Sequence, residues 1–182
     1  MKLFKFLTVL TIFCTLNFPA FCEIYEIDAA KNSINHNNIG MNYFNEGYYY
    51  GAIQEFKIAI SLNPQSQASA AYYDNLGKTY LVIGYPVLAE DCFLNAIKFN
   101  PMNLSYKQHL AETYRKMGKS MLNKKLSYFL NSKKSQDALM AGLIYIEKGD
   151  IKAGVTKLDE FCINEPNLII TEGVRAYLKT LQ

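Results

Sequence analysis

The sequence has no tryptophan, and among its 182 residues there are only two histidines and four cysteines. Neither His36 nor His109 has a cysteine or an acidic residue at a spacing typical of metal ligands. A glycine-rich phosphate loop, a serine nucleophile elbow and a catalytic carboxylate pair are also missing. We therefore expect no catalytic residues, no metal site and no cofactor. The sequence predicts a protein that is not an enzyme.

Charged residues are few, at 19% of the chain, whereas 50% of the residues are apolar. A chain of this length and composition supports one domain of ordinary size with a buried core. The formal net charge is +3 and falls to +1 if residues 1–22 are removed, because Lys2 and Lys5 are lost with them. The remaining chain is therefore neither strongly basic nor strongly acidic.

The apolar run near the N-terminus, from Phe6 to Leu16, has about 11 residues, whereas a membrane-spanning helix needs roughly 20. Two lysines precede the run, and a proline and small residues follow it, as in a secretory signal peptide. We predict that residues 1–22 are a signal peptide, cleaved after Cys22 or after Ala20. An uncleaved anchor and a lipid-modified Cys22 are the alternatives. Export would place the protein in the periplasm or outside the cell, and abundant Asn, Lys, Ile and Tyr favour a bacterial source.

A repeated pattern of residues follows this segment. Two Asn-Pro dipeptides, Asn63-Pro64 and Asn100-Pro101, lie 37 residues apart, and seven positions before each proline agree in type. These positions are Ile39, Gly40, Tyr43, Gly47, Ala52, Phe56 and Ala59 in the first block, and Leu76, Gly77, Tyr80, Gly84, Ala89, Phe93 and Ala96 in the second. A third block, which ends at Pro166, carries the pattern with substitutions. A period of this length indicates a repeat architecture.

This pattern resembles the tetratricopeptide repeat family, whose unit of about 34 residues carries Leu-Gly, Tyr, Gly, Ala, Phe, Ala and Pro in that order. The resemblance implies an all-α fold, in which antiparallel helix pairs stack into a right-handed superhelical α-solenoid. Four repeats are expected, at residues 33–66, 70–103, 104–134 and 135–166. Residues 23–32 would form a lead-in segment, and residues 167–182 a C-terminal helix that caps the last repeat, as such arrays require.

The glycine of each Leu-Gly pair costs about 1 kcal/mol inside a helix relative to alanine. We interpret this glycine as the point where the second helix of a pair approaches closely, opposite small residues such as Ala52 and Ala89. Phe56 and Phe93 are then expected to close the joint to the next repeat.

The third repeat departs from the pattern, because Asn123 and Ser127 stand where a small residue and an aromatic residue are expected. A turn one residue shorter restores an apolar helix face, with Ser120 as the predicted N-cap. Ala111 would then face Leu122, so we expect this helix pair to stand further apart than the others.

Cys92 and Cys162 are expected in the second helices of two different repeats, with a whole helix pair between them. Packed helices lie about 8–10 Å apart, whereas bridged Cα atoms lie within about 7 Å. We predict two buried free thiols, with an intermolecular bridge as the alternative.

Three consecutive tyrosines, Tyr48, Tyr49 and Tyr50, form either an aromatic platform for a ligand or the joint between two helices. We favour the joint, since Tyr49 stands in the predicted turn and Tyr50 opens the next helix. Both are expected to pack, whereas Tyr48 is expected to remain exposed.

In the tetratricopeptide repeat family the first helices line a concave groove, so the resemblance implies a non-catalytic scaffold that binds a protein or peptide there. A mixture of amide, charged and thioether side chains suits an extended or helical peptide. The alternative is a solvated polar face. By their positions in the repeat, the side chains predicted to line the groove are Asn37, Met41, Asp74, Lys78, Gln108 and Glu112.

Positive charge is concentrated between residues 115 and 134, where the sequence has seven cations and no acid. Such a basic stripe would suit an acidic protein or an anionic membrane surface. The protein would then be an envelope assembly factor; a non-catalytic subunit of an enzyme complex and a simple solvated surface are further alternatives. Export argues against nucleic acid as the partner, and the oligomeric state is not predicted. The basic stripe consists of Arg115, Lys116, Lys119, Lys124, Lys125, Lys133 and Lys134.

Overall fold

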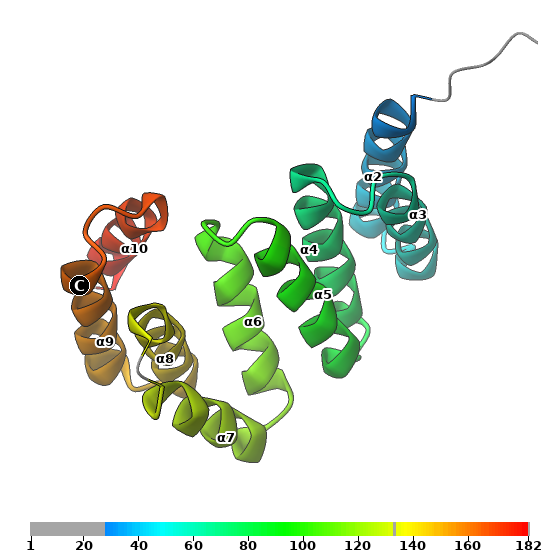
Figure 1. Cartoon of the computed structure of the whole chain (residues 1–182). Coiled ribbons are helices and arrows are strands. Elements are labelled where there is room, and N and C mark those ends of the chain that lie inside the picture. The colour runs from blue at the N-terminus through cyan, green and yellow to red at the C-terminus, as the bar shows by residue number, and fades with distance from the viewer. Residues whose placement is uncertain (1–27, 133, 182) are drawn as a thin grey trace, which may run out of the picture.

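The computed structural model describes residues 28–132 and 134–181, and in these ranges it contains nine α-helices and no strand. The predicted all-α solenoid with a C-terminal capping helix is confirmed (Figure 1). The predicted signal peptide and residues 23–27 of the lead-in segment lie outside the described residues. The helices are α2 (Ala29–Asn45), α3 (Tyr49–Leu62), α4 (Gln67–Val82), α5 (Pro86–Phe99), α6 (Leu104–Lys116), α7 (Lys119–Leu130), α8 (Ser135–Lys148), α9 (Ile151–Asn164) and α10 (Ile169–Thr180).

A glycine with positive φ lies in the turn inside each of the four helix pairs. The φ angles are 83° at Gly47, 84° at Gly84, 102° at Gly118 and 90° at Gly149. Glycine adopts this backbone region without the steric cost that a Cβ atom imposes. The turn glycines therefore set where each first helix ends and the second begins.

The glycines inside the first helices make room for a side chain of the second helix. A Cβ atom added to Gly40 would lie 2.7 Å from the Phe56 ring, and one added to Gly77 would lie 2.7 Å from the Phe93 ring. Both rings are fully buried. The helices approach closely, as expected, but in the first two pairs it is the ring, not an alanine, that meets the glycine.

In the fourth pair, where Leu158 stands at the phenylalanine position, the backbones also come close. A Cβ added to Gly142 would lie 2.8 Å from the Leu158 side chain and 3.1 Å from the carbonyl oxygen of Gly154.

The third helix pair is more open than the other three, as predicted. α6 and α7 make far fewer close approaches than the helices of the other pairs, although Ala111 and Leu122 are both buried. The predicted N-cap at Ser120 is wrong, because α7 already begins at Lys119. Gly118, with its positive φ, completes the turn and acts as the N-cap residue, so Ser120 lies inside the helix.

The array curves with its first helices on the inner side. Along the inner side α2 contacts α4, α4 contacts α6, and α6 contacts α8. Within the described residues the backbones of α3, α5, α7 and α9 do not approach one another closely, although an ion pair joins Lys125 of α7 to Glu90 of α5. α10 packs on α9 and also reaches α6 (Figure 1). None of the described helices is both long and apolar enough to cross a membrane.

The cysteines and two of the three consecutive tyrosines follow the sequence predictions. Cys92 and Cys162 are buried free thiols, Tyr48 is 64% exposed, and Tyr49 packs its ring edge-on against Phe44. The prediction for Tyr50 is wrong, since 72% of this residue is exposed. Tyr50 lies on the solvent face of α3, on the same side as the exposed residues at positions 54 and 57.

Candidate functional site

The N-terminal part of the inner face contains a hydrogen-bonded pair of asparagines. Asn75 on α4 donates from its amide nitrogen to the side-chain oxygen of Asn37 on α2, at 3.0 Å. Asn37 is buried and in turn donates to the Met41 sulfur at 3.6 Å. Met41 itself is 43% exposed. Of these two predicted groove residues, Asn37 thus joins two helices, whereas Met41 is available for contact.

A buried carboxylate joins α4 to α6 further along the same face. The Asp74 carboxylate lies 2.7 Å from Nδ1 of His109 and 3.2 Å from Nζ of Lys78. Only 9% of the Asp74 side chain is exposed, whereas 40% of the Lys78 side chain is. A buried charge is tolerated when it is paired and hydrogen-bonded in this way. Asp74 therefore fixes the spacing of two first helices, and Lys78 presents its stem and part of its charge to solvent.

A small cavity of about 110 Å³ opens between α2 and α4 beside these residues. Its floor includes the buried Phe56 ring, and its rim includes exposed Met41 and the end of Lys78. It combines an apolar interior with amide and ammonium groups at the edge. The lining residues are Met41, Phe44, Asn45, Phe56, Asn75 and Lys78.

The C-terminal part of the inner face is occupied by side chains of the chain itself. Glu112 lies 3.3 Å from Arg115, which also pairs with Glu147 of α8 at 2.6 Å. Tyr177 of α10 faces the same space; burial, and then the Glu147 carboxylate, raise the pKa of its hydroxyl. A cavity of about 150 Å³ remains, and its lining residues are Gln108, His109, Ala111, Glu112, Leu143, Glu147 and Tyr177.

The predicted basic stripe is divided among several environments. Arg115 is held by two acids on the inner face, and Lys125 of α7 pairs with Glu90 of α5 at 2.6 Å. Lys133 lies outside the described residues. Arg115 is exposed although it is paired, and the exposed stripe residues that form no ion pair with a described residue are Lys116, Lys119, Lys124 and Lys134.

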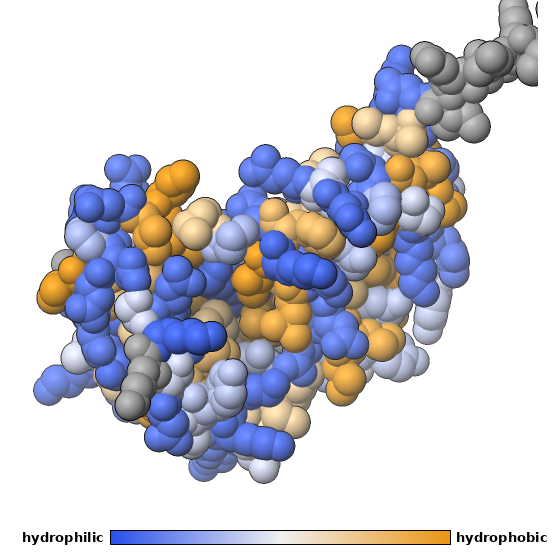
Figure 2. Space-filling model, in the orientation of Figure 1, coloured by the Kyte–Doolittle hydropathy of each residue, from blue (hydrophilic) through white to orange (hydrophobic). Residues whose placement is uncertain are grey.

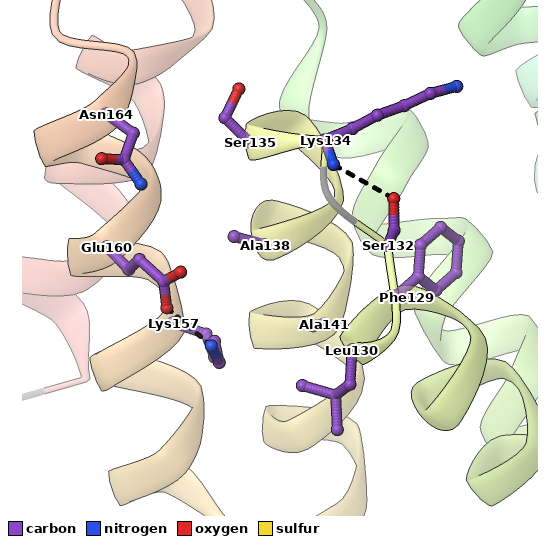
Figure 3. A pocket seen from close by; sticks show the side chains of 10 residues that line it. All are labelled: Phe129, Leu130, Ser132, Lys134, Ser135, Ala138, Ala141, Lys157, Glu160 and Asn164. Atoms are coloured by element: carbon purple, nitrogen blue, oxygen red, sulfur yellow. Dashed lines mark hydrogen bonds and ion pairs between the residues drawn. The ribbon is translucent and has the colours of Figure 1, made fainter.

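Another cavity, of about 300 Å³, lies between the end of α7, the start of α8, and α9 (Figure 3). Lys157 and Glu160 of α9 border it and pair with each other at 2.6 Å. The sequence offered no signal for this cavity. In the part of the chain that the structure describes, no three His, Cys, Asp or Glu side chains cluster as a metal site would require.

The most informative residue that sequence reasoning assigned to the wrong partner is His109. The nearest acidic residue along its own helix is Glu112, three positions later, whereas the structure places His109 against Asp74, 35 residues earlier. Asn75 pairs with Asn37 at a separation of 38 residues. Two polar residues that lie about one repeat length apart in the sequence are the signal that would have predicted both contacts.

Residues 35–66 match the family model of the tetratricopeptide repeat. A search of curated protein sequences gave no match. Pseudomonas aeruginosa pilF has a similar fold, with 16% identity, a TM-score of 0.51, and coverage of 82% of this chain and 68% of that chain. A tetratricopeptide repeat protein from Parabacteroides merdae is similar at 17% identity and a TM-score of 0.50, over 83% and 60% of the two chains.

A third solved structure, the tetratricopeptide repeat protein TTC0263 of Thermus thermophilus, is 23% identical with a TM-score of 0.47, over 82% of this chain and 80% of that chain.

Proposed function

We propose that this tetratricopeptide-type array is a non-catalytic scaffold that binds a peptide or protein segment on its inner face, between α2 and α4. The observation that carries the proposal is the cavity beside Met41 and Lys78. Both side chains are about two-fifths exposed at its rim. Further along the inner face, Arg115 and Glu147 already pair with each other, so their charges are less available to a partner.

The chemistry of the cavity indicates what kind of segment would fit. Met41 offers a flexible, polarisable side chain that adapts to apolar partners. Phe44 and Phe56 extend the apolar surface inward, and Lys78 attracts a carboxylate or a carbonyl oxygen. We infer a partner segment that presents an apolar side chain next to an acidic or carbonyl group.

The hydrogen bonds behind the cavity favour binding because they hold its walls in place. The Asn37–Asn75 and Asp74–His109 contacts connect α2 to α4 and α4 to α6. A surface that is already ordered loses less conformational entropy on binding.

The test is a photo-crosslinking amino acid placed at Met41 in the cell. We expect a discrete crosslinked partner, and a lower yield when Lys78→Gln is added. The matched control places the same crosslinker at Lys152, which is exposed on α9. In that control the added substitution is Lys148→Gln, in place of Lys78→Gln. Equal yields at the two positions, or no effect of Lys78→Gln, would refute binding at this cavity. If the partner is one stoichiometric enzyme, the protein is a non-catalytic subunit of that complex.

We also propose that the protein is exported to the periplasm or the outside of the cell. The proposal rests on the order of charged, apolar and small residues in positions 1–22. Intact mass measurement of protein recovered from its host is expected to show a chain beginning at Glu23, or at Phe21 for cleavage after Ala20. A mass that includes residues 1–22 in a protein confined to the cytoplasm would refute it.

Docking by the basic stripe is a second candidate function, favoured by its exposed residues Lys116, Lys119, Lys124 and Lys134. Changing Lys124 and Lys134 to Glu is expected to release the protein from an acidic partner or an anionic membrane surface. Unchanged cell fractionation and unchanged partner recovery would remove this candidate.

A further inference from the structure

The third helix pair, together with α5, borders an open pocket on the outer side of the array. A cavity of about 490 Å³ lies between α5, α6 and α7, where α7 diverges from α6. Pockets for small organic ligands have volumes of about 300–1,000 Å³. The cavity shares no lining residue with the two inner cavities. It is lined by Glu90, Leu94, Tyr114, Met121, Lys124, Lys125, Tyr128 and Phe129.

Most of the lining is apolar or aromatic. The Tyr114 ring lies at the bottom, with 2% of the residue exposed, and Leu94 and Tyr128 stand at the rim, 45% and 68% exposed. Tyr128 and Phe129 contact each other edge-on, with ring centroids 5.1 Å apart. Figure 2 shows apolar side chains gathered over α5 and α6. A contiguous exposed apolar surface of this kind typically marks a binding site.

The charges around the cavity leave one unbalanced cation at its edge. Lys125 is neutralised by Glu90 at 2.6 Å, and its ammonium lies 4.9 Å from the centroid of the Tyr114 ring. Burial, and then the Glu90 carboxylate, raise the pKa of Tyr114, so its hydroxyl stays neutral. Lys124 is exposed at the rim and forms no ion pair with a described residue. Among the charged groups that line the cavity, one positive charge is therefore in excess.

We propose that this outer cavity binds an amphipathic carboxylate of the fatty-acid type. The hydrocarbon tail lies against Leu94, Met121 and Phe129, and the carboxylate stays at the rim beside Lys124. The Glu90–Lys125 pair is neutral as a unit, so Lys124 is the cation that faces the carboxylate. Burying the methylene groups of the tail drives binding through the hydrophobic effect. The ligand also fills the gap that the divergence of α7 leaves between α5 and α7.

The test is isothermal titration calorimetry of decanoate into the purified full chain. We expect saturable binding at one site, together with an increase in Tm, because a ligand that binds only the folded state stabilises it. Lys124→Gln should weaken decanoate binding about fivefold, the effect of losing about 1 kcal/mol from an exposed ion pair. Leu94→Asn should weaken it through the lost apolar contact. Lys152→Gln and Ile163→Asn change exposed residues on α9 and serve as matched controls.

Three results would overturn the proposal. The first is that decanoate binding does not saturate, or that the two control variants on α9 weaken decanoate binding as much as Lys124→Gln and Leu94→Asn do. The second is that decylamine, with the same tail and a positive head group, binds as well as decanoate. The third is that vesicles containing phosphatidylglycerol retain the protein in a Lys124-dependent manner while free decanoate does not bind, which would assign the site to a membrane surface.

Discussion

The His109 imidazole lies 2.7 Å from the buried Asp74 carboxylate and joins the first helices of two successive repeats. The two residues are 35 positions apart in the chain. Lys78 approaches the other carboxylate oxygen from the same helix as Asp74, at 3.2 Å. The contact therefore ties α4 to α6 through a buried, charge-assisted pair.

Replacing Asp74 with Asn is expected to destabilise the protein by about 1–3 kcal/mol, because a buried group then loses charge-assisted partners. Urea unfolding followed by circular dichroism measures the change. Asp159→Asn, at an exposed position on α9, is the control and should have little effect. Since Asp74 and His109 act together, D74N and H109Q should not be additive. Additive effects would show that the 2.7 Å contact contributes nothing.

Adding a methyl group to a helical glycine should have opposite effects at two positions. Gly40→Ala places a Cβ 2.7 Å from the Phe56 ring, and overpacking of this kind costs about 1–3 kcal/mol. At Gly173 the nearest atom would be 3.8 Å away, on Leu104, so Gly173→Ala should stabilise by up to about 1 kcal/mol through helix propensity. Thermal unfolding of both variants measures the difference. Equal effects would contradict the ring-into-glycine packing.

The buried cysteine of α5 should resist alkylation in the folded protein. Burial raises the pKa of the Cys92 thiol from 9.0 to about 12, so at pH 8 almost none of it is the reactive thiolate. Iodoacetamide labelling followed by mass spectrometry should modify Cys92 only after unfolding in urea. Because folding raises this pKa, the contribution of Cys92 to the free energy of unfolding is fully present below about pH 9. It is lost as the pH rises toward 12. Rapid labelling of the native protein at pH 8 would contradict the burial.

The capping helix depends on its buried face. Val174 lies on the buried face of α10 and is fully buried. An aspartate at this position would bury an unpaired carboxylate at a cost of roughly 2 kcal/mol or more. Ala176→Asp places the same group on the exposed side of the same helix and should cost less than about 1 kcal/mol. Urea unfolding and size-exclusion chromatography compare the two variants. Similar stability and solubility would mean that α10 is not needed to cover the array.

The repeat period predicted most of the fold because each helix pair depends on local residues. The Leu-Gly positions, the turn glycines and the prolines after α3, α5 and α9 act within one repeat, and they stand at regular intervals in the sequence. The loosened third pair was predictable for the same reason, since Asn123 and Ser127 break the pattern locally.

The candidate site was less predictable because its contacts join different repeats. Position in the repeat gave the inner-face residues but not their pairing, so Asn37 and Asp74 were expected to face a partner. They instead bond to Asn75 and His109, one repeat further along. The return of α10 to α6 depends on helix crossing geometry, which residue spacing does not encode. The pairing of Lys125 with Glu90 again spans one repeat length, 35 residues.

The wide backbone spacing among α3, α5, α7 and α9, within the described residues, has a mechanical consequence. These helices meet through side chains such as the Lys125–Glu90 pair, so when the array bends they can separate or approach by rearranging side chains while the inner helices act as hinges. The inner face can therefore widen or narrow at low cost around segments of different thickness. In this respect the array resembles a coil spring more than a rigid rod.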